Sequence, residues 1–130
     1  LVKEVEMQTI FEKCEIVSFH VPLNSETLHM FNKNFIDRMR KPFYIVNTSR
    51  GQIVSTKDLI DGIKKNKILG ACLDVHENES PNFSSIDFNA DLNYLLNCNK
   101  VILTPHIAGI TNESKQNLSN VLIKKILNIK

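Results

Sequence analysis

FYIVNTSRGQIVSTKDLIDGIKKNKILGACLDVH (residues 43–76) contains two apolar runs with a helix-like segment between them. The runs Tyr44–Val46 and Ile68–Leu73 are short and lack polar alternation. This pattern is typical of parallel strands that are covered on both faces. Ser55 is a candidate N-cap for the intervening helix. The apolar face of that helix would consist of Leu59, Ile60 and Ile63. The stretch therefore predicts a strand–helix–strand unit with parallel strands.

The same alternation continues in both directions along the chain. Further apolar runs predict strands at Ile16–Phe19 and Val101–Leu103, and helical segments are expected at residues 9–13, 32–39, 91–96 and 111–129. The last helix has Thr111 as its candidate cap. Its apolar stripe would consist of Leu118, Val121, Leu122 and Ile126. Residues 76–90 are polar and predict a loop of a length that is often functional. We expect an α/β domain built around a parallel sheet.

Polar or ionisable residues follow all four predicted strands. These residues are His20-Val21-Pro22, Asn47-Thr48-Ser49-Arg50-Gly51, Asp74-Val75-His76 and Thr104-Pro105-His106. Ligands of open parallel sheets bind beyond the carboxyl ends of the strands. The sequence therefore predicts a binding or catalytic site at this edge of the sheet.

Composition, net charge and cysteine spacing exclude several classes of protein. The 130 residues include 42% hydrophobic residues and carry a net charge of +2, with lysines scattered rather than gathered into a patch. We therefore expect no nucleic-acid partner, and no stretch is long and apolar enough to suggest a membrane span. The three cysteines show no CxxC spacing, and Cys14 and Cys72 lie beside apolar runs, which predicts buried thiols. This pattern favours a reducing, cytoplasmic setting.

Four motifs carry a resemblance to a known family. HVPLNSETLHMFN, VNTSRGQIV, GACLDVHENE and TPHIAG occur in the order and spacing of D-isomer-specific 2-hydroxyacid dehydrogenases, the family of phosphoglycerate dehydrogenase and the glyoxylate/hydroxypyruvate reductases. The resemblance extends from about Lys13 to the C-terminus. It implies a Rossmann-type NAD-binding domain and an enzyme that interconverts a D-2-hydroxy acid and its 2-keto acid by hydride transfer.

The resemblance also implies three catalytic residues. Arg50 would bind the keto-acid carboxylate and polarise the adjacent carbonyl, for which a guanidinium fork is suited. His106 would donate the proton, since its unperturbed pKa lies near neutral pH. Glu79 would orient His106 and favour its imidazolium form. The family usually has Pro directly after this Glu, whereas this chain has Ser80-Pro81, so Glu77 remains an alternative. Apart from the motif, Arg50 could equally form a surface salt bridge.

The cofactor-binding residues implied by the resemblance follow the same strand ends. They are Val21, Pro22, Thr48, Ser49, Arg50, Asp74, His106, Ala108 and Gly109. Asp74 would accept a hydrogen bond from the nicotinamide carboxamide, although an Asp at that place could instead cap a loop. NAD is the expected cofactor, with NADP left open. His76 with Glu77 and Glu79 lacks a second His at ligand spacing, so we expect no metal site.

A complete dinucleotide-binding fold needs G-x-G-x-x-G after its first strand. The four glycines of this chain form no such motif. Residues 1–130 are therefore expected to be the second half of an NAD-binding domain, with the glycine-rich loop and the substrate domain absent and strand Ile16–Phe19 left as an edge. We expect the isolated chain to be inactive and its parent to be a homodimeric enzyme acting on a small 2-keto acid. The alternative is an NAD-sensing corepressor of the same fold.

Overall fold

Four parallel strands form one sheet in the computed structural model, which describes residues 3–79 and 89–128. The strands are β1 (Ile16–Phe19), β2 (Phe43–Asn47), β3 (Ile68–Leu73) and β4 (Val101–Leu103). Their order in the sheet follows their order in the sequence, and each neighbouring pair is parallel. The prediction of four parallel strands is confirmed, with β2 one residue longer at each end than expected. Strand β1 pairs only with β2 among the described strands, so it forms the expected edge.

Five α-helices and one short 3₁₀ helix connect and follow these strands in the described ranges. They are α1 (Met7–Lys13), α2 (Lys33–Arg38), η1 (Gly51–Ile53), α3 (Thr56–Lys64), α4 (Ala90–Asn97) and α5 (Asn112–Leu127). Side-chain caps start three of them, because Asn32, Asn89 and Thr111 each accept a hydrogen bond from a backbone N–H in the first turn of their helix. Ser55 occupies the predicted N-cap position of α3, but its side chain makes no capping bond within the described residues.

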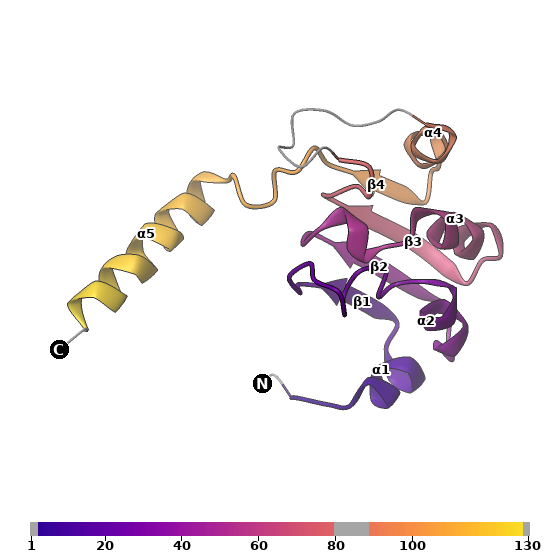
Figure 1. Cartoon of the computed structure of the whole chain (residues 1–130), viewed down its shortest axis with the longest axis horizontal. Coiled ribbons are helices and arrows are strands. Elements are labelled where there is room, and N and C mark those ends of the chain that lie inside the picture. The colour runs from indigo at the N-terminus through magenta and orange to yellow at the C-terminus, as the bar shows by residue number, and fades with distance from the viewer. Residues whose placement is uncertain (1–2, 80–88, 129–130) are drawn as a thin grey trace.

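The hydrophobic core lies between one face of the sheet and helices α1 to α4 (Figure 1). Phe43, Ile45 and Ile68 from the strands are fully buried, as are Phe31 and Leu59. The core also contains a cluster of aromatic rings, with centroids 5.0–6.1 Å apart in largely edge-to-face or tilted contacts. Packing of the helices against the sheet fixes where the strands end, and hence the position of the residues that follow them.

The opposite face of the sheet is exposed, which corrects the prediction of strands covered on both faces. Ile16 is 65% exposed, Tyr44 48% and Ile102 63%. Ile16 and Tyr44 alternate with buried neighbours in their strands, and Ile102 lies between two half-buried residues. Cys72 points to the same uncovered face, so the prediction that it is a buried thiol is wrong, while Cys14 is half-buried. The strands are apolar on both faces, but only one face has partners among the described residues.

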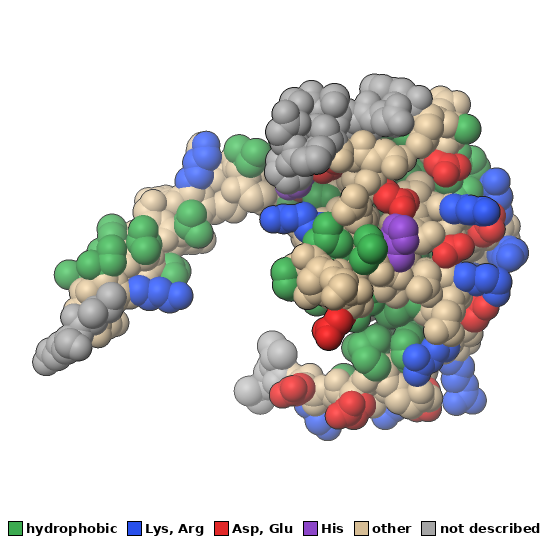
Figure 2. All heavy atoms as spheres, viewed as in Figure 1, with side chains coloured by type: hydrophobic (Ala, Val, Ile, Leu, Met, Phe, Trp, Pro, Cys, Tyr) green, Lys and Arg blue, Asp and Glu red, His purple; other side chains and the backbone are tan. Residues whose placement is uncertain are grey.

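Helix α5 extends away from the sheet and its other helices (Figure 1). It begins after Thr111, as the sequence predicts, and none of its described residues is buried. Its predicted apolar stripe is present but exposed, with Leu118 at 75% and Val121 at 52%, and it forms the green surface of the projecting arm in Figure 2. The amphipathic pattern thus predicts the helix correctly, but it does not indicate what the apolar side of the helix contacts.

The predicted loop between residues 76 and 90 is described in part. His76–Glu79 follow β3 directly, and Asn89 and Ala90 belong to the start of α4. The Ser80-Pro81 departure from the family pattern lies outside the described residues. No helix in the described part of the chain is long and apolar enough to cross a membrane.

Candidate active site

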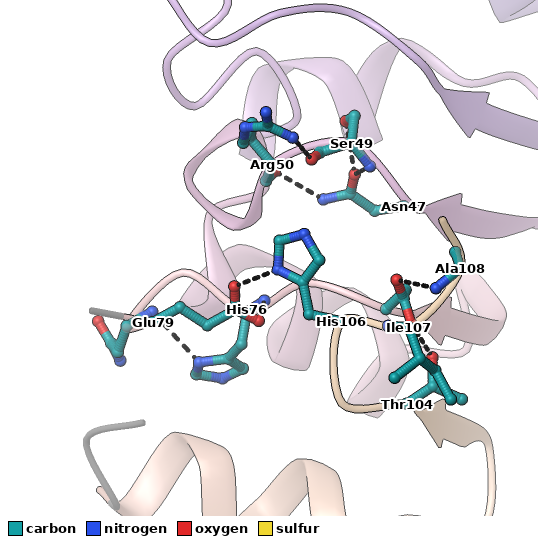
Figure 3. A network of polar contacts seen from close by, with 11 residues as sticks. Asn47, Ser49, Arg50, His76, Glu79, Thr104, His106, Ile107 and Ala108 are labelled. Atoms are coloured by element: carbon teal, nitrogen blue, oxygen red, sulfur yellow. Dashed lines mark hydrogen bonds and ion pairs between the residues drawn. The ribbon is translucent and has the colours of Figure 1, made fainter. Parts of the chain in front are cut away.

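The residues singled out after the four strands meet at the carboxyl edge of the sheet. Because β1 to β4 are parallel and in register, Val21 and Pro22, the Thr48–Arg50 turn, Asp74 and His106 all follow strand ends at this edge. Figure 3 shows the Arg50 turn, the segment after β3 and the segment after β4 around a common space. The sequence-based prediction that they share one rim is confirmed.

Asn47 shapes the turn that carries Arg50. Its side chain is fully buried at the end of β2. The amide Nδ2 donates to the Arg50 carbonyl at 3.0 Å, and Oδ1 accepts from the backbone N–H of Ser49 at 3.1 Å and from its hydroxyl at 2.8 Å. This is an Asx-type turn, in which a side-chain amide replaces a backbone partner. Asn47 therefore fixes where the arginine leaves the sheet.

Arg50 itself is exposed and available to a ligand. Its Nη1 donates to the Ser49 carbonyl at 2.6 Å, a contact within the same turn. Within the described residues it has no carboxylate partner, since the ion pairs formed there join other side chains. The alternative of an arginine used in a surface salt bridge therefore finds no support in the structure.

Gly51 allows the Arg50 turn to pack directly on the segment after β3. A Cβ atom at this position would lie 1.9 Å from the His76 carbonyl oxygen and 2.1 Å from its carbon. Gly51 does not have a positive φ, so its role is close approach of two backbones rather than a left-handed turn conformation. Any side chain here would push Arg50 and the His76 segment apart.

Asp74 binds the segment after β4. Its Oδ1 accepts from the Thr104 hydroxyl at 2.5 Å and from the Ile107 N–H at 2.9 Å, and its Oδ2 accepts from the Ala108 N–H at 2.8 Å. Burial is the largest single influence on the pKa of Asp74 and acts to raise it, but these hydrogen bonds and His106 together hold the pKa below its ordinary value. The carboxylate is therefore an anion that caps this turn, as the loop-capping alternative expected.

His106 and Glu79 form the ion pair that the family resemblance implies. Nδ1 of His106 lies 3.0 Å from Oε2 of Glu79, and the two side chains are 30% and 12% exposed. Glu79 is itself oriented, because its Oε1 accepts from the His76 backbone N–H at 2.8 Å. His106 has a left-handed backbone with φ of 56°, which is held by its N–H bonding to the Asp74 and Thr104 carbonyls. The second ring nitrogen points toward the Arg50 turn (Figure 3).

Glu77, the alternative partner for His106, points elsewhere. Its Oε1 lies 2.6 Å from Nε2 of His29, and its Oε2 accepts from the Thr56 N–H at 2.8 Å. Among the two acidic residues that the sequence left open, Glu79 is the one that contacts His106. The His29 side chain is 46% exposed, and Glu77 is its partner.

A pocket of about 270 Å³ opens against the ends of β3 and β4 and the segments that follow them. It is lined by Thr48, Cys72, Leu73, Asp74, Ile102, Thr104, Ile107, Ala108 and Thr111. Its walls combine apolar side chains with the edge of the buried Asp74 carboxylate. Gly109 lies next to it in sequence, and a Cβ there would meet nothing within 4 Å. The lining is mainly apolar, with Thr48, Asp74, Thr104 and Thr111 as its polar residues.

Comparison with known proteins decides the family. Residues 1–108 match the family described as D-isomer specific 2-hydroxyacid dehydrogenase, NAD binding domain. The chain belongs to this family. Members of the D-2-hydroxyacid dehydrogenase family that it resembles include a glyoxylate reductase of Thermofilum pendens, 36% identical over 94% of this chain and 34% of that protein. A D-lactate dehydrogenase of Staphylococcus aureus is 38% identical over 80% of this chain and 33% of that protein.

Solved structures of this dehydrogenase family have the same architecture. The D-lactate dehydrogenase of Lactobacillus jensenii with NAD+ superposes with a TM-score of 0.79 at 31% identity, covering 92% of this chain and 38% of that one. The D-lactate dehydrogenase of Aquifex aeolicus complexed with NAD and lactic acid gives a TM-score of 0.75 at 30% identity, covering 94% and 39%. The chain thus spans about a third of the length of the curated relatives it matches.

Asn47 is the functional residue that sequence reasoning passed over. It lies in the motif VNTSRG but was not assigned a role, whereas its side chain organises the whole Arg50 turn. The available signal was an Asn at the end of an apolar strand, a position typical of Asx turns. The sequence indicated Glu77 only as an alternative to Glu79. Its contact with His29 has no local sequence signal, because the two residues lie 48 positions apart.

Proposed function

We propose that this chain is part of the NAD-binding domain of an enzyme that interconverts a D-2-hydroxy acid and its 2-keto acid. The observation that carries the proposal is the arrangement of one cation, one histidine and one carboxylate at a single rim: Arg50 without an ion-pair partner in the described part, and His106 held by Glu79. An NAD-sensing corepressor of the same fold can retain these three residues, so turnover by the full-length protein decides between the two functions.

Arg50 binds the keto-acid substrate in this proposal. Its guanidinium is permanently charged and presents a planar fork that matches a carboxylate in two hydrogen bonds, where a lysine ammonium would act as a point charge. The same group withdraws electron density from the adjacent carbonyl. The Asn47-ordered turn and the contact of Gly51 with His76 hold the arginine against the edge where His106 lies.

His106 supplies the proton and Glu79 positions it. NAD, when bound in its reduced form, would supply a hydride to the keto carbon, which leaves a negative charge on the keto oxygen. The ketone oxygen then needs a proton, for which histidine is the suited donor near neutral pH. With Nδ1 turned to Glu79, the proton to be given is that on Nε2, the ring nitrogen facing the Arg50 turn. Glu79 stabilises the imidazolium and fixes the ring plane.

The cofactor's nicotinamide end fits the pocket beside Asp74. Val21, Pro22, Thr48, Ser49, Ala108 and Gly109 would surround it together with Arg50 and His106. Asp74 Oδ2 accepts one internal hydrogen bond, from Ala108, and therefore retains capacity for a carboxamide N–H. Residues that would bind the pyrophosphate through a glycine-rich loop do not occur in this sequence.

The test of the proposed function is turnover by the full-length protein that contains this chain. Glyoxylate, pyruvate and longer 2-keto acids would be added to the protein and NADH, and NADH consumption and the chirality of the product would be measured. The proposal expects NADH consumption with at least one of these acids and a product of D configuration. An L product, or binding of NADH with no turnover on any 2-keto acid, would contradict it and favour a sensing role.

A further inference from the structure

The Glu77 carboxylate lies where three separate segments of the chain meet. Its Oε1 contacts Nε2 of His29 at 2.6 Å, in the segment that precedes α2. Its Oε2 accepts from the N–H of Thr56 at 2.8 Å, the first residue of α3. Glu77 itself belongs to the segment after β3, two residues before Glu79. One side chain thus joins residues 48 and 21 positions away along the sequence.

Glu77 replaces the missing cap of α3. The N–H of Thr56 is one of the donors at a helix start that lack an intrahelical partner, and Ser55 does not cap it within the described part of the chain. A carboxylate is favoured at this end of a helix. Burial acts to raise the pKa of Glu77, but hydrogen bonds from the Thr56 hydroxyl and N–H, and from His29, hold the pKa below its ordinary value. Glu77 is therefore anionic and 23% exposed at its side chain.

The same three segments are joined by backbone contacts. The N–H of His29 donates to the Gln52 carbonyl at 2.9 Å, and the N–H of Ser55 donates to the Phe31 carbonyl at 2.9 Å. Gly51 packs against the His76 carbonyl. These contacts hold the segments side by side, but none of them fixes the stretch beyond His76. Beyond His76, the N–H of Glu79 donates to the His76 carbonyl at 3.1 Å and the N–H of Asn78 donates to Nδ1 of His76 at 3.2 Å, both within this segment. In the described part of the chain, the Glu77 side chain joins this stretch to α3 and to His29, two residues before the residue that contacts His106.

We propose that Glu77 is a positioning residue of the active site: by fastening the segment after β3 to Thr56 and His29, it holds Glu79 against Nδ1 of His106. The proposal rests on the proposed role of Glu79 and His106. Loss of Glu77 would release the stretch 77–79 from α3. Glu79 would then be held by its hydrogen bonds to His76 alone, its contact with Nδ1 of His106 would loosen, and the tautomer of the His106 ring would be selected less strongly.

Nuclear magnetic resonance of the chain tests this without relying on turnover. Two-bond proton–nitrogen spectra of the His106 ring, recorded at about pH 8, above the ordinary histidine range, distinguish the Nδ1–H tautomer from the Nε2–H tautomer. Amide hydrogen exchange reports the bonds at Thr56 and His76. The variants are Glu77→Ala, Glu77→Gln and Glu79→Ala, with Asp61→Ala as the control, an exposed carboxylate on α3.

Glu77→Ala is expected to speed exchange at Thr56 and His76 roughly tenfold or more, since hydrogen bonds to a charged group are lost. The His106 ring is expected to move toward the tautomer mixture of Glu79→Ala. Glu77→Gln should restore part of both effects, because its amide oxygen can still accept from Thr56, and Asp61→Ala should match the wild type. If Glu77→Ala does not fold, His29→Ala tests the same connection from its other end, with a smaller shift of the same kind expected.

Two results would overturn the proposal, and they differ. Faster exchange at Thr56 with an unchanged His106 ring, while Glu79→Ala does change that ring, would show that Glu77 only caps α3. A His106 ring that is the same in Glu79→Ala and in the wild type would instead count against the proposed Glu79–His106 pair, and through it against the role of Glu77.

Discussion

At the scale of single residues, the proposed chemistry depends on a few side chains held by their neighbours. Arg50 takes its place from Asn47, and Glu79 is bound by the backbone of His76 as well as by His106. The sequence indicated Arg50, Glu79 and His106 through their motifs. It did not indicate the residues that hold them, because those contacts join positions that come together only when the strand ends align.

Arg50→Lys in the full-length protein should show whether the guanidinium fork matters. The change keeps the positive charge but removes the two parallel hydrogen bonds to the carboxylate. We expect kcat/KM for keto-acid reduction to fall roughly 10- to 100-fold, the usual effect of losing a charge-assisted hydrogen bond, with most of the change in KM. Steady-state kinetics would measure this. Arg40→Lys, at an exposed position away from the site, should leave both constants unchanged; an equal effect of both variants would contradict the assignment.

His76 should make the stability of the chain depend on pH. It is 6% exposed, and burial lowers its pKa below the ordinary 6.5, although Glu79, Glu77 and Asp91 act to raise it. The unfolded chain therefore binds more protons than the folded chain as pH falls below about 6.5. The free energy of unfolding should decrease as pH falls through this window. Glu77, with a pKa below its ordinary 4.5, loses its contribution only at lower pH.

Urea denaturation of the wild type and of His76→Phe at a series of pH values measures this dependence. Phe keeps an aromatic ring at this buried position, which lines a pocket together with Leu92 and Leu103, and Phe cannot be protonated. The variant should therefore lose less stability than the wild type as pH falls below about 6.5. Parallel curves for the two proteins would show that His76 does not cause the effect.

At the scale of elements, sequence patterns predicted the positions of the strands correctly but not which faces of the sheet are covered. Ile16–Phe19, Ile68–Leu73 and Val101–Leu103 coincide with the observed strands because short apolar runs are a local signal. Burial of the second sheet face is not local, since it depends on which elements pack there. Cys72 and Ile102 lie on that exposed face, and the sequence alone could not distinguish it from the covered face.

Helix α5 and helix α4 should respond very differently to substitution. Leu118 on α5 is 75% exposed, whereas Leu95 on α4 is 1% exposed and belongs to the core. We expect Leu118→Lys to change the free energy of unfolding of the chain by less than about 0.5 kcal/mol. Leu95→Ala should cost about 2–5 kcal/mol, the range for a truncated core leucine. Chemical denaturation checks both, and a large loss for Leu118→Lys would mean that α5 packs on the rest of the chain.

At the scale of the whole molecule, we propose that the chain carries one side of a dinucleotide site. The sheet edge offers Arg50, His106 and the pocket beside Asp74, while the sequence contains no G-x-G-x-x-G motif for the pyrophosphate. The fold class and the shared rim followed from the spacing of the strands. The contact of Glu77 with His29 did not, because it joins side chains 48 positions apart in the sequence. The caps of the Asp74 turn did not either, because backbone donors carry no sequence signal.

The isolated chain should bind NAD weakly. Much of the affinity for a dinucleotide comes from backbone N–H groups at a helix start that grip the pyrophosphate, and the residues here would contact only the nicotinamide end. Isothermal titration calorimetry of the chain with NAD should give a dissociation constant of about 1 mM or weaker, the range expected when few contacts offset the loss of free motion. Micromolar binding would show that a phosphate site exists outside the proposed pocket.

The central claim is that His106 donates the proton in keto-acid reduction. The most direct measurement is kcat for reduction by the full-length protein carrying His106→Gln, compared with His20→Gln. His20 is an exposed histidine at the same sheet edge, hydrogen-bonded to Ser18. We predict that His106→Gln lowers kcat roughly 10²–10⁴-fold, the usual contribution of general acid catalysis, and that His20→Gln does not. A His106→Gln enzyme with the kcat of the wild type would contradict the account.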